Sequence, residues 1–140
     1  MAWRLLLCVA FVGGLGYPQW SQLESVFAGS DHNVTFEIDN VGCADDTVSL
    51  DYCTSSAYSA CSSLAAEINA VDTGYSPVVT GDADAATVTV HHLSGCTKLK
   101  VNILSESEGT GCNHEPIIWS CFANPQDPRD AEIGGVVSID

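Results

Sequence analysis

The sequence predicts an α+β fold that is mostly β: an antiparallel sheet or sandwich-like domain of about seven strands with one packed helix at about 55–71, stabilised by disulfides. Three observations predict this fold. Apolar and polar residues alternate in several short segments, one segment instead repeats at helical spacing, and six of the seven cysteines follow an export signal. At 140 residues, one domain is expected.

Residues 1–16 are expected to be a secretory signal peptide. A basic residue precedes an apolar run at 5–12, and small residues follow it, which is the order a secretory signal requires. We expect cleavage before Tyr17, with a later cut near Val26 or Ala28 as the alternative. The apolar run is shorter than the roughly 20 residues of a bilayer span, and no second run follows, so no membrane span is expected.

Residues 17–140, expected to form a single secreted domain, are strongly acidic. The formal charge of the whole chain is −14, with 18 Asp and Glu, and it becomes −15 when Arg4 leaves with the signal. This excess repels phosphate backbones and anionic lipid headgroups, so nucleic acid and acidic membranes are poor partners. The charge and the export signal together predict a soluble, extracellular protein.

The mature chain would keep six cysteines, and an even number in an exported protein predicts three structural disulfides. The six are Cys43, Cys53, Cys61, Cys96, Cys112 and Cys121. The sequence does not select one of the many pairings. The closest two, Cys53 and Cys61, have seven residues between them, which is too wide for the close cysteine pairs of zinc sites.

The first strand is expected at 33–39, where NVTFEID alternates strictly. Its inward residues would be Val34, Phe36 and Ile38. Asn33 begins an Asn-Val-Thr sequon on the solvent face, where an N-linked glycan could stand. The segment 47–52, TVSLDY, repeats the pattern, and turn residues at 40–46 join the two, so an antiparallel pair is the simplest connection.

The period then changes to that of a helix. Between 55 and 71, apolar residues recur at spacings of four and three and share one stripe: Ala57, Cys61, Leu64, Ile68 and Val71. Hydroxyl residues at 54–56 suit the N-terminal cap, and Gly74 suits the C-terminal cap. A disulfide from Cys61 would join the helix to the sheet. The many serines leave a loop as the alternative.

Strands are expected again at 76–80 and in TVTVHH, residues 87–92. Successive strand side chains point to opposite faces, so the adjacent His91 and His92 are not expected to bind one metal ion. His91 would lie on the outer face and His92 at the end of the core face. After the Ser-Gly turn at 94–95, alternation resumes at 98–103 and indicates a hairpin with 87–92.

Two more strands are expected to close the chain. The segment 116–122, PIIWSCF, is apolar enough to be a central strand, and 133–139, IGGVVSI, follows a loop rich in proline and aspartate. The order of the strands cannot be read from the sequence.

No cofactor is expected. Loop carboxylates at Asp82 and Asp84 could bind calcium weakly, although their spacing is not that of an EF-hand. The segment HNVTF at 32–36 resembles the histidine-bearing strand of small blue copper proteins. Such sites also need a cysteine followed closely by histidine and methionine. Neither Cys53 nor Cys121 is followed by those residues, so the chain is assigned to no copper family.

Catalysis has no sequence motif in its favour. The chain has no G-x-S-x-G, H-E-x-x-H or glycine-rich phosphate loop. If the protein is an enzyme, a small secreted hydrolase is the form expected. His114 would then be the first histidine to test, because it follows a turn and precedes the apolar segment 116–122.

The leading functional hypothesis, reached by exclusion, is a secreted recognition or structural module that binds another extracellular molecule, such as a protein or a glycan. A flat patch with Trp20 or other exposed aromatic residues would favour this hypothesis. The alternative is a carrier of a small apolar ligand, whose cavity would be lined by the helix stripe and by Phe36, Val88, Val101 and Trp119. An internal cavity of several hundred cubic ångströms would favour the carrier.

Overall fold

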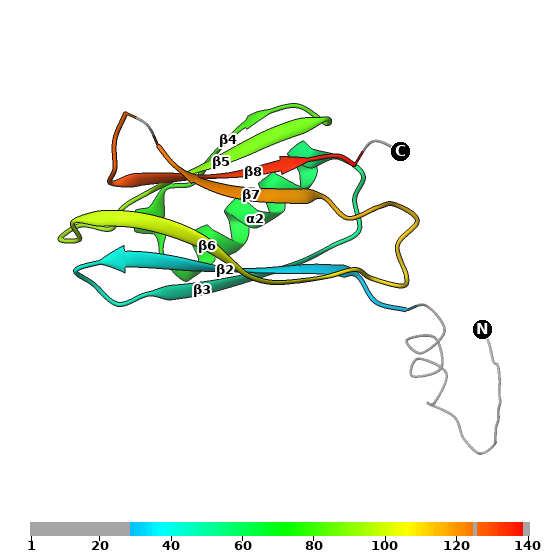
Figure 1. Cartoon of the computed structure of the whole chain (residues 1–140), viewed down its shortest axis with the longest axis horizontal. Coiled ribbons are helices and arrows are strands. Elements are labelled where there is room, and N and C mark those ends of the chain that lie inside the picture. Colours follow the sequence, from blue (N-terminus) through cyan, green and yellow to red (C-terminus); the bar gives the residue numbers. More distant parts are fainter. Residues whose placement is uncertain (1–28, 125, 139–140) are drawn as a thin grey trace, which may run out of the picture. The chain divides into compact units, whose positions relative to one another are not determined.

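Seven strands and one α-helix build the part of the chain that the computed structural model describes, residues 29–124 and 126–138 (Figure 1). They are β2 (His32–Val41), β3 (Asp46–Tyr52), α2 (Ala57–Val71), β4 (Val78–Gly81), β5 (Ala85–His91), β6 (Lys98–Ser107), β7 (Ile118–Ala123) and β8 (Asp130–Val136), with a short 3-10 helix, η1 (Thr73–Tyr75). All belong to the unit Asp31–Asp140. The expected fold class is confirmed. The expected signal at 1–16, its cleavage sites and Trp20 lie outside the described residues.

The strands form two antiparallel sheets, one with the order β3-β2-β6 and the other with the order β4-β5-β8-β7. The alternation in β2 produces the expected two faces, since Val34, Phe36 and Ile38 are fully buried. Phe36 lies opposite Val48 of β3 and Ile103 of β6. The apolar faces of the strands therefore point into the space between the two sheets.

Helix α2 occupies that space on the side where β3 and β5 are its main neighbours (Figure 1). The helix begins where the Ser56 hydroxyl accepts the N–H of Ser59, 3.2 Å away, which satisfies one of the unpaired N–H groups of the first turn. Its buried residues are Ala57, Ala60, Cys61, Leu64 and Ile68. The expected stripe is thus largely observed, although Val71 at its end is 43% exposed.

Aromatic side chains fill the core between the sheets. Trp119 makes edge-to-face contacts with Phe36 and Tyr52, with ring centroids 5.7 and 5.8 Å apart. The Tyr52 hydroxyl accepts hydrogen bonds from the indole N–H of Trp119 and the backbone N–H of Ile117, both at 3.1 Å. Phe36, Trp119, Val88 and Val101 all belong to this one packed cluster. These four side chains therefore fill the interior at the place where the carrier hypothesis put a cavity.

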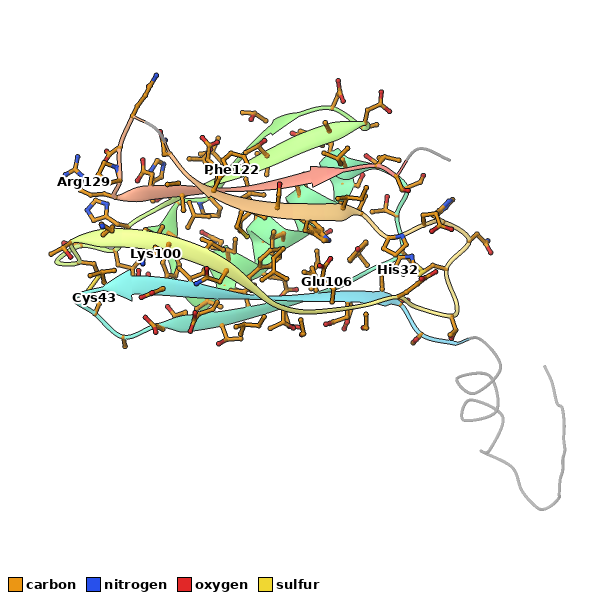
Figure 2. The ribbon with its side chains drawn as sticks, viewed as in Figure 1. His32, Cys43, Lys100, Glu106, Phe122 and Arg129 are labelled. Atoms are coloured by element: carbon orange, nitrogen blue, oxygen red, sulfur yellow. A yellow bond between two sulfur atoms is a disulfide. The ribbon has the colours of Figure 1, made fainter. Side chains whose placement is uncertain are left out.

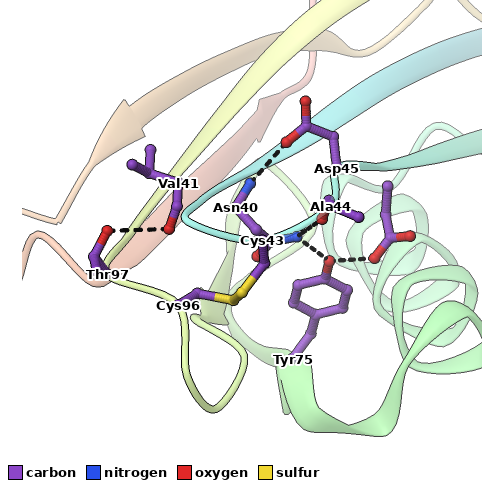
Figure 3. Close-up of a disulfide and its surroundings, with 9 residues drawn as sticks. Asn40, Val41, Cys43, Ala44, Asp45, Tyr75, Cys96 and Thr97 are labelled. Atoms are coloured by element: carbon purple, nitrogen blue, oxygen red, sulfur yellow. Dashed lines mark hydrogen bonds between the residues drawn. A yellow bond between two sulfur atoms is a disulfide. The ribbon is translucent and has the colours of Figure 1, made fainter.

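The expected hairpin between 87–92 and 98–103 is not formed. β5 and β6 belong to different sheets, and the loop between them crosses from one sheet to the other. Thr97 holds the crossing by donating its N–H and its hydroxyl to the carbonyl of Val41, at 2.9 and 3.0 Å. Cys96 adds a disulfide to Cys43 (Figure 3). A Ser-Gly turn indicates that the chain reverses but does not specify whether the next strand pairs with the last one.

The segment expected to be a central strand is also placed differently. β7 is an edge strand, and β8 lies between it and β5. Apolar composition suggested burial on both faces of β7. However, Ile118 and Phe122 on its outer face are 56% and 46% exposed. β7 therefore carries hydrophobic residues on both faces although it lies at the edge of the sheet.

Two disulfides join four of the six cysteines expected to be bridged. Cys43–Cys96 ties the β2–β3 turn to the β5–β6 loop, and Cys53–Cys112 ties the end of β3 to the β6–β7 loop. The structure differs from the expectation of a third bridge, because Cys61 and Cys121 are free.

The two free thiols lie in different surroundings. The sulfur of Cys61 faces Gly135, 3.3 Å from where a Cβ on that glycine would lie. Cys121, on β7, instead pairs with Ile133 of β8 and lines the space between β7 and β6. Helix α2 is therefore held to the sheets by packing and not by the expected disulfide.

A buried polar network lies beside the Cys43–Cys96 bridge (Figure 3). The side-chain amide of Asn40, 1% exposed, donates to the carbonyl of Ala44 at 3.0 Å and to the hydroxyl of Tyr75 at 2.7 Å. Tyr75 in turn donates to the carboxylate of Asp46. Burial raises the pKa of Tyr75 well above its usual value, so the hydroxyl keeps its proton. The network holds the β2–β3 turn against η1.

Candidate functional site

The outer face of the four-stranded sheet carries a group of exposed apolar side chains on β7 and β8. Ile118 lies opposite Val136, and the two residues are 56% and 43% exposed. Phe122, on the same face of β7, is 46% exposed. We call Ile118, Phe122 and Val136 the β7–β8 patch. Trp119 alternates with these residues and points inward, so β7 presents apolar side chains on both faces.

A glycine of β8 lies beside the Phe122 ring. Gly134 lies opposite Ser120, between Ile118 and Phe122 along the strand pair. A Cβ at Gly134 would be 3.1 Å from the Ser120 hydroxyl oxygen and 3.4 Å from an edge carbon of the Phe122 ring. The ring therefore lies across the backbone of β8, over the position that a side chain would otherwise occupy. Gly134 therefore leaves room for the Phe122 ring on this face, where the Ser120 hydroxyl lies between Ile118 and Phe122.

A crevice of about 170 Å³ opens between β6 and β7 and shares Phe122 with the patch. Its lining residues are Leu99, Lys100, Val101, Asn102, Cys121, Phe122, Ala123 and Ala131. An apolar cavity of about 150 Å³ holds one benzene molecule, whereas small-molecule sites usually measure about 300–1,000 Å³. The crevice is therefore large enough for one apolar side chain of a partner but smaller than the cavity that the carrier hypothesis requires.

One carboxylate flanks the patch. Glu132 lies opposite Phe122 across the β7–β8 ladder, on the same face of the sheet. Among the described residues, the close contacts between a basic and an acidic side chain are His91 with Asp130 and Arg129 with Asp127. Glu132 takes part in neither, so the patch is bordered by a negative charge without a cationic partner.

His114, the candidate catalytic residue, is an exposed loop residue. Its backbone carbonyl accepts a hydrogen bond from Nε2 of His32 at 2.7 Å. Within residues 29–124 and 126–138, no hydrogen bond links its imidazole to a carboxylate or a hydroxyl. A catalytic histidine is usually oriented by such a partner, so the geometry gives the hydrolase hypothesis no support.

His32, in the segment that resembles a copper-protein strand, has both ring nitrogens engaged. Nδ1 accepts the N–H of Gly109 at 2.8 Å, and Nε2 donates to His114. The neutral ring has one lone pair, on Nδ1, and Gly109 already uses it. The ring closes a loop and offers no nitrogen to a metal.

The remaining candidate ligands lie in different surroundings. His91 lies on the outer face, with Nδ1 3.1 Å from a carboxylate oxygen of Asp130. Nδ1 of His92 is buried without a hydrogen-bond partner. The Asp82 carboxylate caps the β4–β5 turn by accepting the N–H groups of Asp84 and Ala85 at 2.9 and 3.1 Å. Asp84 itself is exposed.

One group of potential metal ligands lies close together in the part of the chain that the structure describes. It consists of Asp31, Cys53 and Cys112. Both of its sulfurs are joined in a disulfide, so neither is available as a thiolate ligand.

The free cysteines are poor nucleophiles. Burial raises the pKa of Cys61 and of Cys121 to about 11. Because the thiolate is the reactive form, neither sulfur is activated at neutral pH. These residues serve as small apolar side chains in the core.

Asn33 lies on the outer face of the three-stranded sheet, not on the face that carries the patch. Its amide donates to the Ser49 hydroxyl at 3.0 Å and to the Asp51 carboxylate at 2.7 Å. Both partners belong to the neighbouring strand β3, so the amide helps to hold β2 and β3 together.

Comparison with known protein families, with curated proteins and with solved structures gave no match. No helix among the described residues is both long and apolar enough to cross a membrane.

Proposed function

We propose that this protein is a secreted recognition module that binds another extracellular protein through the β7–β8 patch. The observation that carries the proposal is the exposure of Ile118, Phe122 and Val136 on one face. Single apolar residues are common on protein surfaces, but contiguous patches often indicate binding sites. Full burial of such a side chain contributes about 1.5–3 kcal/mol, so covering the exposed half of each would contribute roughly 1 kcal/mol.

The position of the patch strengthens the proposal. Edge strands are usually protected by charged residues, proline or a covering element. β7 instead places a phenylalanine and an isoleucine outward, beside a crevice that fits one side chain. Interfaces commonly combine a flat apolar surface with a pocket for an anchoring residue.

An extracellular setting is supported by the two disulfides, which persist in oxidising compartments, and by the export signal expected at 1–16. A glycan on Asn33 would cover the outer face of the three-stranded sheet. The outer face of the four-stranded sheet, with the patch, would then remain free for a protein partner.

Site-specific photo-cross-linking in the extracellular fluid around the producing cells tests this proposal. A photoreactive residue would replace Ile118 or Phe122 in turn, and Leu104 of β6, which is 53% exposed, is the matched control. The proposal expects the same protein adduct from both patch positions and little or none from position 104. Equal yields at all three positions, or no adduct at the patch, would contradict it.

A further inference from the structure

We infer that the partner presents an apolar segment that also carries lysine or arginine, with a positive charge placed over β8. This inference rests on the proposed function and adds the chemistry of the partner. It is carried by the unpaired carboxylate of Glu132 at the border of the β7–β8 patch.

The carboxylate lies at the Phe122 end of the patch, because Glu132 is the cross-strand neighbour of Phe122. A partner that covers the apolar surface must therefore approach this charge. A lysine or arginine at that end would pair with it, whereas an uncharged partner would cover it without compensation.

Charge also argues against a second copy of this chain as the partner. The chain carries a formal charge of −14. A symmetric dimer through the patch would also bring Glu132 of both copies to the same interface. Like charges in that position oppose association. The same repulsion disfavours an anionic membrane surface.

The cations of the described chain limit where the partner's charges can lie. Lys100 lines the crevice on the β6 side, and Phe122 lines it on the β7 side (Figure 2). A positive group over β6 would meet Lys98 and Lys100. The group that enters the crevice should therefore be apolar, with the positive charges confined to the other side of Phe122.

Binding of short synthetic peptides tests this inference. The probe is a fluorescein-labelled peptide of alternating leucine and lysine, followed by fluorescence anisotropy at physiological ionic strength. Leucine–glutamate and serine–lysine peptides of the same length separate the apolar contribution from the charge. We expect the leucine–lysine peptide to bind at least about tenfold more tightly than either.

Variants locate the site. Glu132→Gln should weaken binding of the leucine–lysine peptide about two- to five-fold, the range of an exposed ion pair, and Glu132→Lys should weaken it further. Glu67→Gln, on the exposed face of α2, makes the same change in net charge away from the patch and should have no effect. Lys100→Gln should leave binding unchanged or strengthen it.

The outcomes separate this inference from the proposed function. If Ile118→Ser and Phe122→Ser weaken peptide binding but the charge variants match Glu67→Gln, the patch binds and the inferred partner charge is wrong. The inference also fails if the patch variants bind the peptide like wild type, or if no peptide binds. The proposed function is then tested by the cross-linking experiment alone. Patch-dependent self-association, or patch-dependent binding to zwitterionic lipid vesicles, would overturn the inferred partner. Thermal unfolding of each variant controls for loss of folding.

Discussion

The N–H of Gly109 donates a hydrogen bond of 2.8 Å to Nδ1 of His32, a residue 77 positions earlier in the chain. The opposite nitrogen of the ring donates to the carbonyl of His114 at 2.7 Å. The imidazole is 1% exposed and stacks at a tilt on Tyr52. One neutral side chain therefore fastens the β6–β7 loop to the start of β2.

Replacing His32 with alanine should lower the free energy of unfolding by about 1–3 kcal/mol, because a partly buried N–H loses its acceptor and a gap opens beside Tyr52. Urea unfolding measures the change. The control is His91→Ala, which removes a partly exposed contact with the Asp130 carboxylate and should lower the free energy of unfolding by at most about 1 kcal/mol. Equal losses in the two variants would contradict the role assigned to His32.

The buried thiols should make the protein less stable in alkali. Burial raises the pKa of Cys61 from 9.0 to about 11, and that of Cys121 likewise. The fold thus favours the protonated thiols. This contribution to stability is complete below about pH 9 and is lost as the pH rises through about 11.

Urea unfolding across this pH range, for wild type and Cys61→Ala, isolates the effect from the titration of lysine and tyrosine. The wild type should lose more stability than the variant between pH 9 and 11. Parallel pH profiles would show that Cys61 does not titrate as the structure requires.

Each disulfide should contribute substantially to stability. Cys43–Cys96 and Cys53–Cys112 span 53 and 59 residues, and constraining loops of that length in the unfolded chain is worth about 2–4 kcal/mol each. Replacing both cysteines of one pair with serine should lower the unfolding free energy by that amount. Cys61→Ala should lower the unfolding free energy by a smaller amount, because this substitution breaks no disulfide. Chemical denaturation compares the three variants, and a larger loss for Cys61→Ala would show that a Cys61 bridge exists.

Two adjacent glycines of β8 should respond differently to alanine. A Cβ at Gly135 would lie 3.1–3.3 Å from Ile117, Trp119 and Cys61 in the core, so Gly135→Ala should cost about 1–3 kcal/mol by overpacking. A Cβ at Gly134 would meet Ser120 and Phe122 on the exposed face, where both side chains can move. Gly134→Ala should therefore lower the free energy of unfolding less than Gly135→Ala does. Thermal or urea unfolding of the two variants tests this order, and the reverse order would mean that the helix does not pack on β8 as described.

The sequence predicted the elements well because each carries a local signal. Alternation in NVTFEID and the four-and-three spacing from Ala57 to Ile68 require no knowledge of the rest of the chain. Which of the two sheets a strand joins has no such local signal. The pattern of β5 and β6 is compatible both with a hairpin and with a crossing between sheets, and the disulfide at Cys96 that fixes the crossing cannot be paired from sequence.

The candidate site was missed for a related reason. Ile118 and Phe122 alternate with the inward Trp119 and Cys121, so β7 is apolar on both faces. The same pattern is typical of a central strand, and only the sheet order shows that the outer face is uncovered. The even number of cysteines likewise suggested three bridges, whereas the distance between sulfur atoms decides which ones form.

The central claim is tested most directly with the partner protein that cross-links at position 122. The measurement is the affinity of this partner for two matched variants of the chain. Ile118→Ser removes an apolar side chain from the β7–β8 patch, and Leu104→Ser removes one of similar size and exposure from β6. The account predicts that isothermal titration calorimetry will show at least about tenfold weaker binding for Ile118→Ser and no more than about a twofold change for Leu104→Ser. Equal affinities for the two variants would contradict it.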